Sequence, residues 1–129
     1  SVLQTTNVDI AKNEATFQQA LLEDDYGKMW ECVFIACYNI CKHIYSKRGF
    51  IAQEDDLYDT SINSTMMVMR NIQERGAKPE KLSSYCYLRC LCHVNGYGRD
   101  DKFIKKLNAK LSNINEKGYL SEYIEETIQ

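Results

Sequence analysis

The chain has 129 residues, with 16 basic and 18 acidic side chains, a formal net charge of −2 and 44% hydrophobic residues. A chain of this length makes one domain, residues 1–129, and buries enough surface to fold without disulfides or a metal. Its balanced charges and many apolar groups exclude a disordered chain, and no apolar run approaches the about 20 residues that cross a bilayer. The N-terminus lacks the pattern of a secretory signal, so we expect a cytoplasmic protein with no membrane contact.

The charges are distributed unevenly along the chain. Residues 1–69 hold 5 basic and 10 acidic side chains, residues 70–110 hold 10 and 4, and residues 111–129 hold 1 and 4. A total near zero argues against nucleic-acid binding, but charges act over only about 8–10 Å, so the local balance matters more. The basic middle can therefore face a polyanion while the acidic parts face a basic protein. The alternative is solvated helix faces whose charges cluster by chance.

Apolar residues at steps of three and four predict helices along the whole chain. The first 15 residues, roughly, are expected to form a loosely attached helix. A long helix is expected from about Asp24 to Lys47, with Gly49 just beyond its end and Trp30 as the main aromatic residue of the core. Its apolar stripe contains Trp30, Val33, Phe34, Cys37, Ile40, Cys41, Ile44 and Tyr45.

Acidic residues open the next predicted helix. The run from Gln53 to Asp56 suits a first turn, because the helix dipole favours carboxylates there. This helix is expected to end near Glu74, before Gly76. We expect its methionines, Met66, Met67 and Met69, to fill the core rather than to form a binding surface. Its apolar side contains Leu57, Tyr58, Ile62, Met66, Met69 and Ile72.

A polar connection over residues 75–81, which contains the only proline, precedes a further helix. Ser83 or Ser84 can cap this helix, and the glycines of residues 95–98 end it. Two more segments read as helical: residues 96–114 as an additional basic helix, and residues 115–129 as an acidic C-terminal tail or helix. The sequence therefore predicts an all-α, compact bundle of four to five helices.

The six cysteines do not indicate disulfides. Two pairs of them stand four residues apart within predicted helices, where cysteines usually act as small buried hydrophobic residues. Without a signal peptide, free thiols are expected. Structural zinc sites usually place a close cysteine pair in a turn, so no metal is expected. The alternative is a zinc site made by Cys86, Cys90, Cys92 and His93.

Signatures of common enzymes are absent: there is no glycine-rich phosphate loop, no nucleophile elbow and no metalloprotease histidine pair. The sequence around His43 and His93 shows no pattern typical of nucleophilic or acid–base chemistry. Asp55, Asp56 and Asp59 resemble metal ligands, but carboxylates in a first helical turn already have a physical reason to be there. We therefore expect no catalytic residues, no cofactor and no enzymatic activity.

Four segments between residues 33 and 95 are informative through their order. They are a basic-glycine turn at the end of residues 40–49, an Asp-Leu helix start at residues 55–59, Arg-Gly-Ala-Lys at residues 75–78 and a serine-tyrosine stretch at residues 81–89. In this order they resemble region 2 of the sigma-70 family of bacterial transcription initiation factors. The match covers about half the chain, and residues 24–95 correspond to the region 2 core.

This resemblance implies two binding surfaces. In the family, the helix that begins with the Asp-Leu motif docks on the coiled coil of the polymerase's largest subunit. The following helix faces the promoter, where aromatic rings trap unstacked bases and basic groups contact phosphates. By position, polymerase binding is assigned to Asp56, Asp59, Thr60 and Asn63, with nearby Met66 packing against or beside the interface. DNA binding is assigned to Lys78, Lys81, Ser84, Tyr85, Tyr87, Arg89, Arg99, Lys102, Lys105 and Lys106.

The DNA-facing helix has two features of its own. Tyr85 corresponds to the family tyrosine against which a flipped adenine stacks, and Tyr87 points about 200° away on a helix, so one of the two is expected in the core. Leu88 and Arg89 stand near the position of the tryptophan pair of primary sigma factors.

We therefore expect a sigma-like initiation factor that binds bacterial RNA polymerase and engages or melts AT-rich promoter DNA, without catalytic chemistry. A single-domain chain of this kind is similar to late sigma-like factors of bacteriophages, which use a tail peptide to contact another protein. Residues 119–124 are the candidate for such a peptide, the alternative being a tail helix folded on the core. The alternative function is a small helical structural or adaptor protein, for example a phage virion component, that binds only protein.

Overall fold

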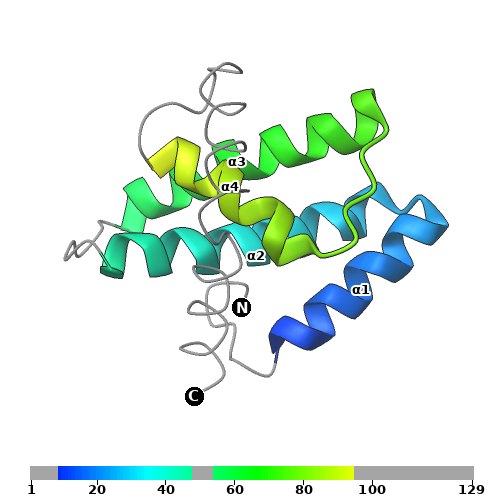
Figure 1. Cartoon of the computed structure of the whole chain (residues 1–129), viewed down its shortest axis with the longest axis horizontal. Coiled ribbons are helices and arrows are strands. Elements are labelled where there is room, and N and C mark those ends of the chain that lie inside the picture. The colour runs from blue at the N-terminus through cyan, green and yellow to red at the C-terminus, as the bar shows by residue number, and fades with distance from the viewer. Residues whose placement is uncertain (1–8, 48–53, 95–129) are drawn as a thin grey trace, which may run out of the picture.

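The computed structural model describes residues 9–47 and 54–94, which form four helices (Figure 1). The helices are α1 (Asp9–Glu23), α2 (Tyr26–Lys47), α3 (Glu54–Arg75) and α4 (Leu82–Val94). No strand occurs in these two ranges, which confirms the predicted all-α helical bundle. Within them, no helix is both long and apolar enough to cross a membrane. The helices predicted after residue 95 lie outside the described residues.

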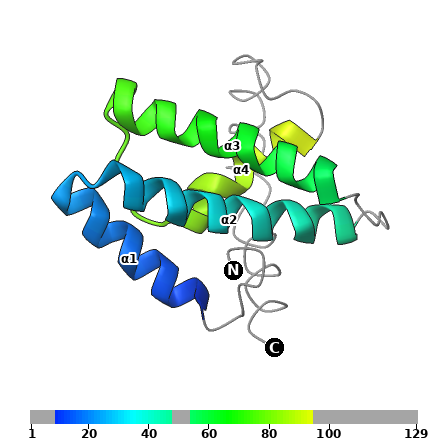
Figure 2. The same cartoon turned by 180° about the vertical axis from the view of Figure 1, so that it is seen from behind.

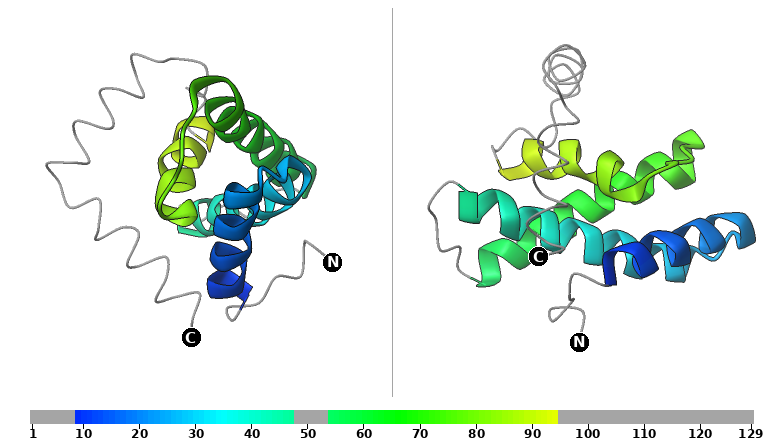
Figure 3. Two further views of the ribbon diagram at one scale, coloured as in Figure 1. Left: turned by 90° about the vertical axis from the view of Figure 1, so that its right-hand side faces the viewer. Right: turned by 60° about the horizontal axis from the view of Figure 1, so that its bottom comes forward.

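Helix α2 is the centre of the bundle, because the three most extensive helix–helix contacts are those that it makes with α1, α3 and α4. Helices α2, α3 and α4 run back and forth across the molecule, and the end-on view shows them around a shared interior (Figures 2 and 3). Helix α1 lies against α2 and also contacts α4. The buried residues of α2 recur at the spacing of one helix face: Met29, Cys32, Val33, Ala36, Cys37, Tyr38, Ile40, Cys41 and Ile44.

Helix α1 is an integral part of the bundle, which corrects the prediction of a loosely attached N-terminal helix for residues 9–15; residues 1–8 of that prediction lie outside the described residues. Phe17 is 0% exposed, and Ala20 is also buried. Phe17 therefore takes the place in the core that was predicted for Trp30, which is only partly buried. Because burial of one large apolar side chain contributes about 1.5–3 kcal/mol, Phe17 gives α1 a substantial attachment to the core.

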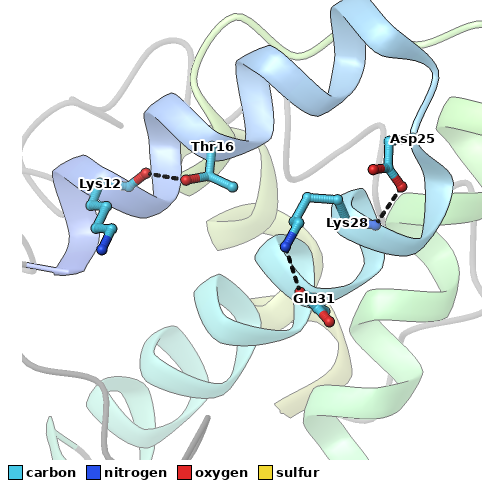
Figure 4. Close-up of polar contacts among 5 residues, drawn as sticks. All are labelled: Lys12, Thr16, Asp25, Lys28 and Glu31. Atoms are coloured by element: carbon cyan, nitrogen blue, oxygen red, sulfur yellow. Dashed lines mark hydrogen bonds and ion pairs between the residues drawn. The ribbon is translucent and has the colours of Figure 1, made fainter.

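Residues of the junction between α1 and α2 form the hydrogen bonds that end α1 and cap α2. Asp24 has a positive φ of 53°, and the Asp25 N–H donates to the Ala20 carbonyl at 3.0 Å, which ends α1. The Asp25 carboxylate then accepts a hydrogen bond from the Lys28 N–H at 3.1 Å and caps α2 (Figure 4). Helix α2 thus begins at Tyr26, two residues later than predicted.

Two further contacts, one within α1 and one within the first turns of α2, involve exposed groups (Figure 4). The Thr16 hydroxyl donates to the Lys12 carbonyl at 2.9 Å within α1. Lys28 and Glu31 form an ion pair at 3.5 Å with both side chains largely exposed. Exposed pairs of this kind contribute about 0–1 kcal/mol, so they do not determine where the helices lie.

The buried face of α3 differs from the predicted one. It includes the hydroxyl residues Ser61, Ser64 and Thr65, which donate to carbonyls four residues earlier at 2.6, 2.8 and 2.7 Å. These hydroxyls are satisfied within the helix, so their burial costs little, and their small volume suits close helix packing. Tyr58 and Met66, predicted to be core residues, are each 48% exposed. The apolar residues of the buried face are Leu57, Val68, Met69 and Ile72.

Helix α3 ends at Arg75, as the glycine after it predicted. Gly76 has a positive φ of 68°, a conformation that favours glycine. The Ala77 N–H donates to the Asn71 carbonyl at 3.0 Å and folds the chain back across the end of the helix. This turn sends the connection toward the start of α4.

Candidate functional site

The start of α3 presents a group of carboxylates to solvent. Glu54, Asp55 and Asp56 occupy the first turn, Asp59 follows in the next turn, and all four side chains are exposed. None of them forms an ion pair with another residue in the described part of the chain. The partial positive charge at a helix N-terminus favours such carboxylates, so they are stable there without basic neighbours. They remain available to a basic partner.

Three of the four residues assigned to polymerase share one exposed face of α3. Asp56, Asp59 and Asn63 are spaced by three and four residues, and all are exposed. Met66 continues the row three residues later, so its predicted place in the core is wrong. We call these four residues the α3 stripe. Thr60 is not part of it, because its hydroxyl lies 3.2 Å from that of Tyr45 on α2.

An aromatic group lies beside the start of α3 and was not predicted as a surface feature. The ring of Tyr58 lies 5.5 Å from that of Phe34 on α2, and Phe34 lies 6.0 Å from Tyr38. Tyr58 directly follows the buried Leu57, which turns it about 100° away from the core face. The exposed ring therefore lies next to the carboxylates of the first turn.

Two of the lysines assigned to DNA lie in the connection between α3 and α4. Lys78 and Lys81 are exposed, whereas Pro79 between them is buried. The side-chain amide of Gln18 on α1 donates to the carbonyls of Pro79 and Glu80 at 2.9 and 3.0 Å. Helix α1 therefore holds the connection in place, with both lysines facing solvent.

The first turn of α4 is capped from another helix. The Glu14 carboxylate on α1 accepts hydrogen bonds from the N–H groups of Leu82 and Ser83, both at 2.8 Å. This arrangement corrects the prediction that Ser83 or Ser84 caps α4. A carboxylate at a helix N-terminus also interacts favourably with the helix dipole. No local pattern signals the cap, because Glu14 precedes Leu82 by 68 residues.

The residues of α4 assigned to DNA are less accessible than predicted. Ser84, Tyr85, Tyr87 and Arg89 are all half-buried, and no residue of α4 is exposed. Both tyrosines pack against the core, whereas only one was predicted to do so. The exposed part of the predicted DNA surface, among the described residues, is therefore the pair of lysines before the helix.

The side chain of Arg89 lies on the ring of Tyr85. The guanidinium carbon is 3.7 Å from the ring centroid, and Nη1 donates to the Tyr85 carbonyl at 2.9 Å. The Arg89 Nε is buried and has no hydrogen-bond partner among the described residues. We call this arrangement the Tyr85–Arg89 stack. It combines a cation–π contact with a hydrogen bond to the same residue.

The remaining predicted sites cannot be placed on this surface. Arg99, Lys102, Lys105 and Lys106, assigned to DNA, lie outside the described residues, as does the candidate tail peptide at residues 119–124. The site as described therefore consists of the α3 stripe, the two lysines of the connection, and the Tyr85–Arg89 stack.

All six cysteines are free and buried, as predicted. The Cys90 thiol lies 3.7 Å from the Cys37 carbonyl, where α2 and α4 meet. Burial raises the pKa of the Cys86 and Cys90 thiols, and burial together with Glu31 raises the pKa of Cys32 to about 11. These thiols are therefore protonated at neutral pH and act as small apolar groups. No group of three potential metal ligands occurs in the described ranges.

Comparison with known proteins does not assign a family. The chain matches no protein-family model, no curated protein and no solved structure.

Proposed function

We propose that the protein is a sigma-like initiation factor. In this proposal the α3 stripe binds bacterial RNA polymerase, while the α3–α4 connection and α4 engage AT-rich promoter DNA. The observation that carries the proposal is the position of two chemically different surfaces at the two ends of α3. The acidic residues lie at its start, and the exposed lysines follow its end.

The length of α3 keeps these surfaces apart. A helix of 22 residues spans about 33 Å, at about 1.5 Å per residue. This separation exceeds the screening distance of about 8–10 Å at physiological salt several times over. The carboxylates at the start of α3 therefore do not repel a polyanion that binds near the lysines, and one helix can serve a protein and a nucleic acid together.

The charge of the α3 stripe supports binding to a basic protein partner. Its carboxylates attract a basic partner and limit the orientations in which that partner can bind. Met66 adds an apolar contact, and an exposed methionine adapts well to a partner's surface. The nearby exposed ring of Tyr58 is a second apolar contact of a type that is common in interfaces.

The connection between α3 and α4 supports DNA binding. Lys78 and Lys81 are exposed on a segment whose backbone is fixed by Gln18. Little backbone conformational entropy is therefore lost when the two lysines contact phosphates. Each phosphate contact should steepen the salt dependence of binding, by about 0.9 in the slope of log K against log salt. The aromatic ring of Tyr85 would supply the contact with an unpaired base.

Capture of bacterial core RNA polymerase by the tagged full chain tests the proposal. The wild type should retain the polymerase, and Asp56→Arg with Asp59→Arg should lower the affinity at least tenfold. Glu74→Arg with Glu80→Arg is the matched control, because it makes the same charge change at exposed sites outside the α3 stripe. Failure of the wild type to bind, or equal loss in both double variants, would contradict the proposal.

One observation favours a second function, that of an adaptor or structural protein that binds only protein. No residue of α4 is exposed, so its aromatic rings are not presented to DNA as a ready surface. The α3 stripe alone would then be the functional surface. Assembly of the purified chain into a discrete oligomer, without affinity for polymerase or DNA, would favour this function.

A further inference from the structure

We propose that Arg89 covers the ring of Tyr85 and must be displaced before a nucleobase can stack there. Arg89 would then determine how readily α4 traps an unpaired base, a role distinct from simple contact with phosphate. The inference rests on the proposed function, because it concerns the same DNA-facing helix. It assigns Arg89 as a specificity-determining residue of that helix.

The geometry of the Tyr85–Arg89 stack leaves no room for a base on the covered face. At 3.7 Å from the ring centroid, the guanidinium occupies the layer that a stacked base would need. Tyr85 is half-buried and packs against the hydrophobic core, so only part of its ring is open to solvent, and Arg89 covers one face of it. A base and the guanidinium therefore compete for the same position.

Only contacts with Tyr85 hold the Arg89 guanidinium over the ring, among the described residues. Arg89 interacts with the ring and carbonyl of Tyr85, four residues earlier on the same helix. Its Nε has no partner among the described residues, and no described carboxylate forms an ion pair with it. Base stacking is of similar strength to the cation–π contact that it would replace, whereas the hydrogen bond to the Tyr85 carbonyl would be given up. A displaced guanidinium can then bind a phosphate of the incoming strand.

Two DNA probes separate base stacking from phosphate contact. One is a forked AT-rich duplex with unpaired adenines, and the other is the same fork with abasic sites in place of those adenines. Both carry the same phosphates, so the ratio of the abasic to the adenine dissociation constant measures base trapping alone. The protein used is the full chain, with circular dichroism to verify that each variant is folded.

Arg89→Ala should raise this ratio by about threefold to tenfold, because the ring no longer has to be uncovered. Tyr85→Ala should bring the ratio to about one, and Arg89→Ala should have no further effect in that background. Lys81→Ala is the matched control, since it removes an exposed positive charge near the helix start and should weaken both probes equally. An unchanged or lowered ratio in Arg89→Ala would overturn the inference.

A measurement without DNA distinguishes the failure of this inference from failure of the proposed function. Nitration of Tyr85 by tetranitromethane, followed by mass spectrometry, reports how accessible the ring is in the free protein. Arg89→Ala should be nitrated several times faster than the wild type at Tyr85, and Arg89→Lys, which lacks the planar group, should lie between them. If no variant binds DNA, the proposed function fails. If nitration of Tyr85 is unchanged, the cover itself is refuted.

Discussion

Helices α2 and α4 begin in different ways. Helix α2 is capped by Asp25, which lies immediately before it, whereas α4 is capped by Glu14, 68 residues earlier on α1. The cap of α2 requires only residues of the α1–α2 junction. The cap of α4 exists only when α1 is docked on the bundle. The start of α4 is therefore a tertiary feature, although a helix start is usually a property of the local sequence.

This difference gives α1 a role in the candidate site. Glu14 holds the first turn of α4, and Gln18, one turn later, holds the connection that carries Lys78 and Lys81. Phe17 lies between them in sequence and attaches α1 to the core. The surface proposed to meet DNA is thus positioned by a helix that is not part of it.

The largest expected effect comes from detaching α1. Phe17→Ala should lower the free energy of unfolding by about 3–5 kcal/mol, because it removes a fully buried aromatic side chain and leaves a cavity. Chemical denaturation gives the loss of stability. Hydrogen exchange should show that the amides of Leu82 and Ser83 lose protection, because their acceptor on α1 is displaced with the helix.

Leu22→Ala is the matched control for this change. Leu22 lies on the same helix but is 82% exposed, so its truncation should change the stability by no more than about 0.5 kcal/mol. Similar losses in both variants would show that α1 contributes through helix formation alone. Protection of Leu82 and Ser83 that survives Phe17→Ala would contradict the dependence of α4 on α1.

Removal of the long-range cap should have the next largest effect. Glu14→Ala leaves two N–H groups of α4 without their acceptor and should cost about 1–3 kcal/mol in chemical denaturation. Glu14→Gln should cost less, since the amide oxygen can still accept one of the bonds. Gln19→Ala, an exposed change on the same helix, serves as the control. A cost equal to that of the control would show that water replaces Glu14 without loss.

The same contrast explains which parts of the fold could be predicted from sequence. The ends of α2 and α3 follow from local signals: the periodic apolar residues, the carboxylates at Glu54–Asp56 and the glycine at position 76. The cap of α4 could not be predicted from local signals, because Glu14 lies far from α4 in the sequence. The buried face of α3 was predicted only in part, because a search for apolar residues passes over hydroxyl residues such as Thr65. The hydroxyl of Thr65 can be buried, since it donates a hydrogen bond to a carbonyl of its own helix.

The candidate site was predictable to a similar degree. Asp56, Asp59 and Asn63 are exposed on one face, as expected of polar residues at helical spacing. Met66 lies on the solvent side of α3 instead of in the core, and Thr60 is partly buried, with its hydroxyl hydrogen-bonded to that of Tyr45. The contact of Arg89 with Tyr85 depends on a side-chain conformation that spacing of four residues permits but does not require.

A smaller effect is expected from the local cap. Asp25→Ala removes the acceptor of the Lys28 N–H and should cost about 1 kcal/mol. Asp25→Ser, which keeps a side-chain acceptor, should be nearly neutral. Hydrogen exchange should place the loss of protection in the first turn of α2 and leave Leu82 and Ser83 unaffected. Loss of protection in α4 as well would mean that the two helix starts are coupled.

Effects no larger than that are expected at the ends of α1 and α3, where Asp24 and Gly76 both have positive φ, 53° and 68°. Glycine takes this conformation without strain, whereas an aspartate pays a steric cost. Asp24→Gly should therefore raise the free energy of unfolding by about 0.5–1 kcal/mol, and Gly76→Ala should lower it by about 1 kcal/mol. A Cβ at Gly76 would meet nothing within 4 Å, so that loss would report backbone conformation alone. Asp24→Asn, which tolerates the same conformation, is the control and should be close to neutral. Changes of the same sign at Asp24→Gly and Gly76→Ala would mean that something other than backbone strain determines how these two helices end.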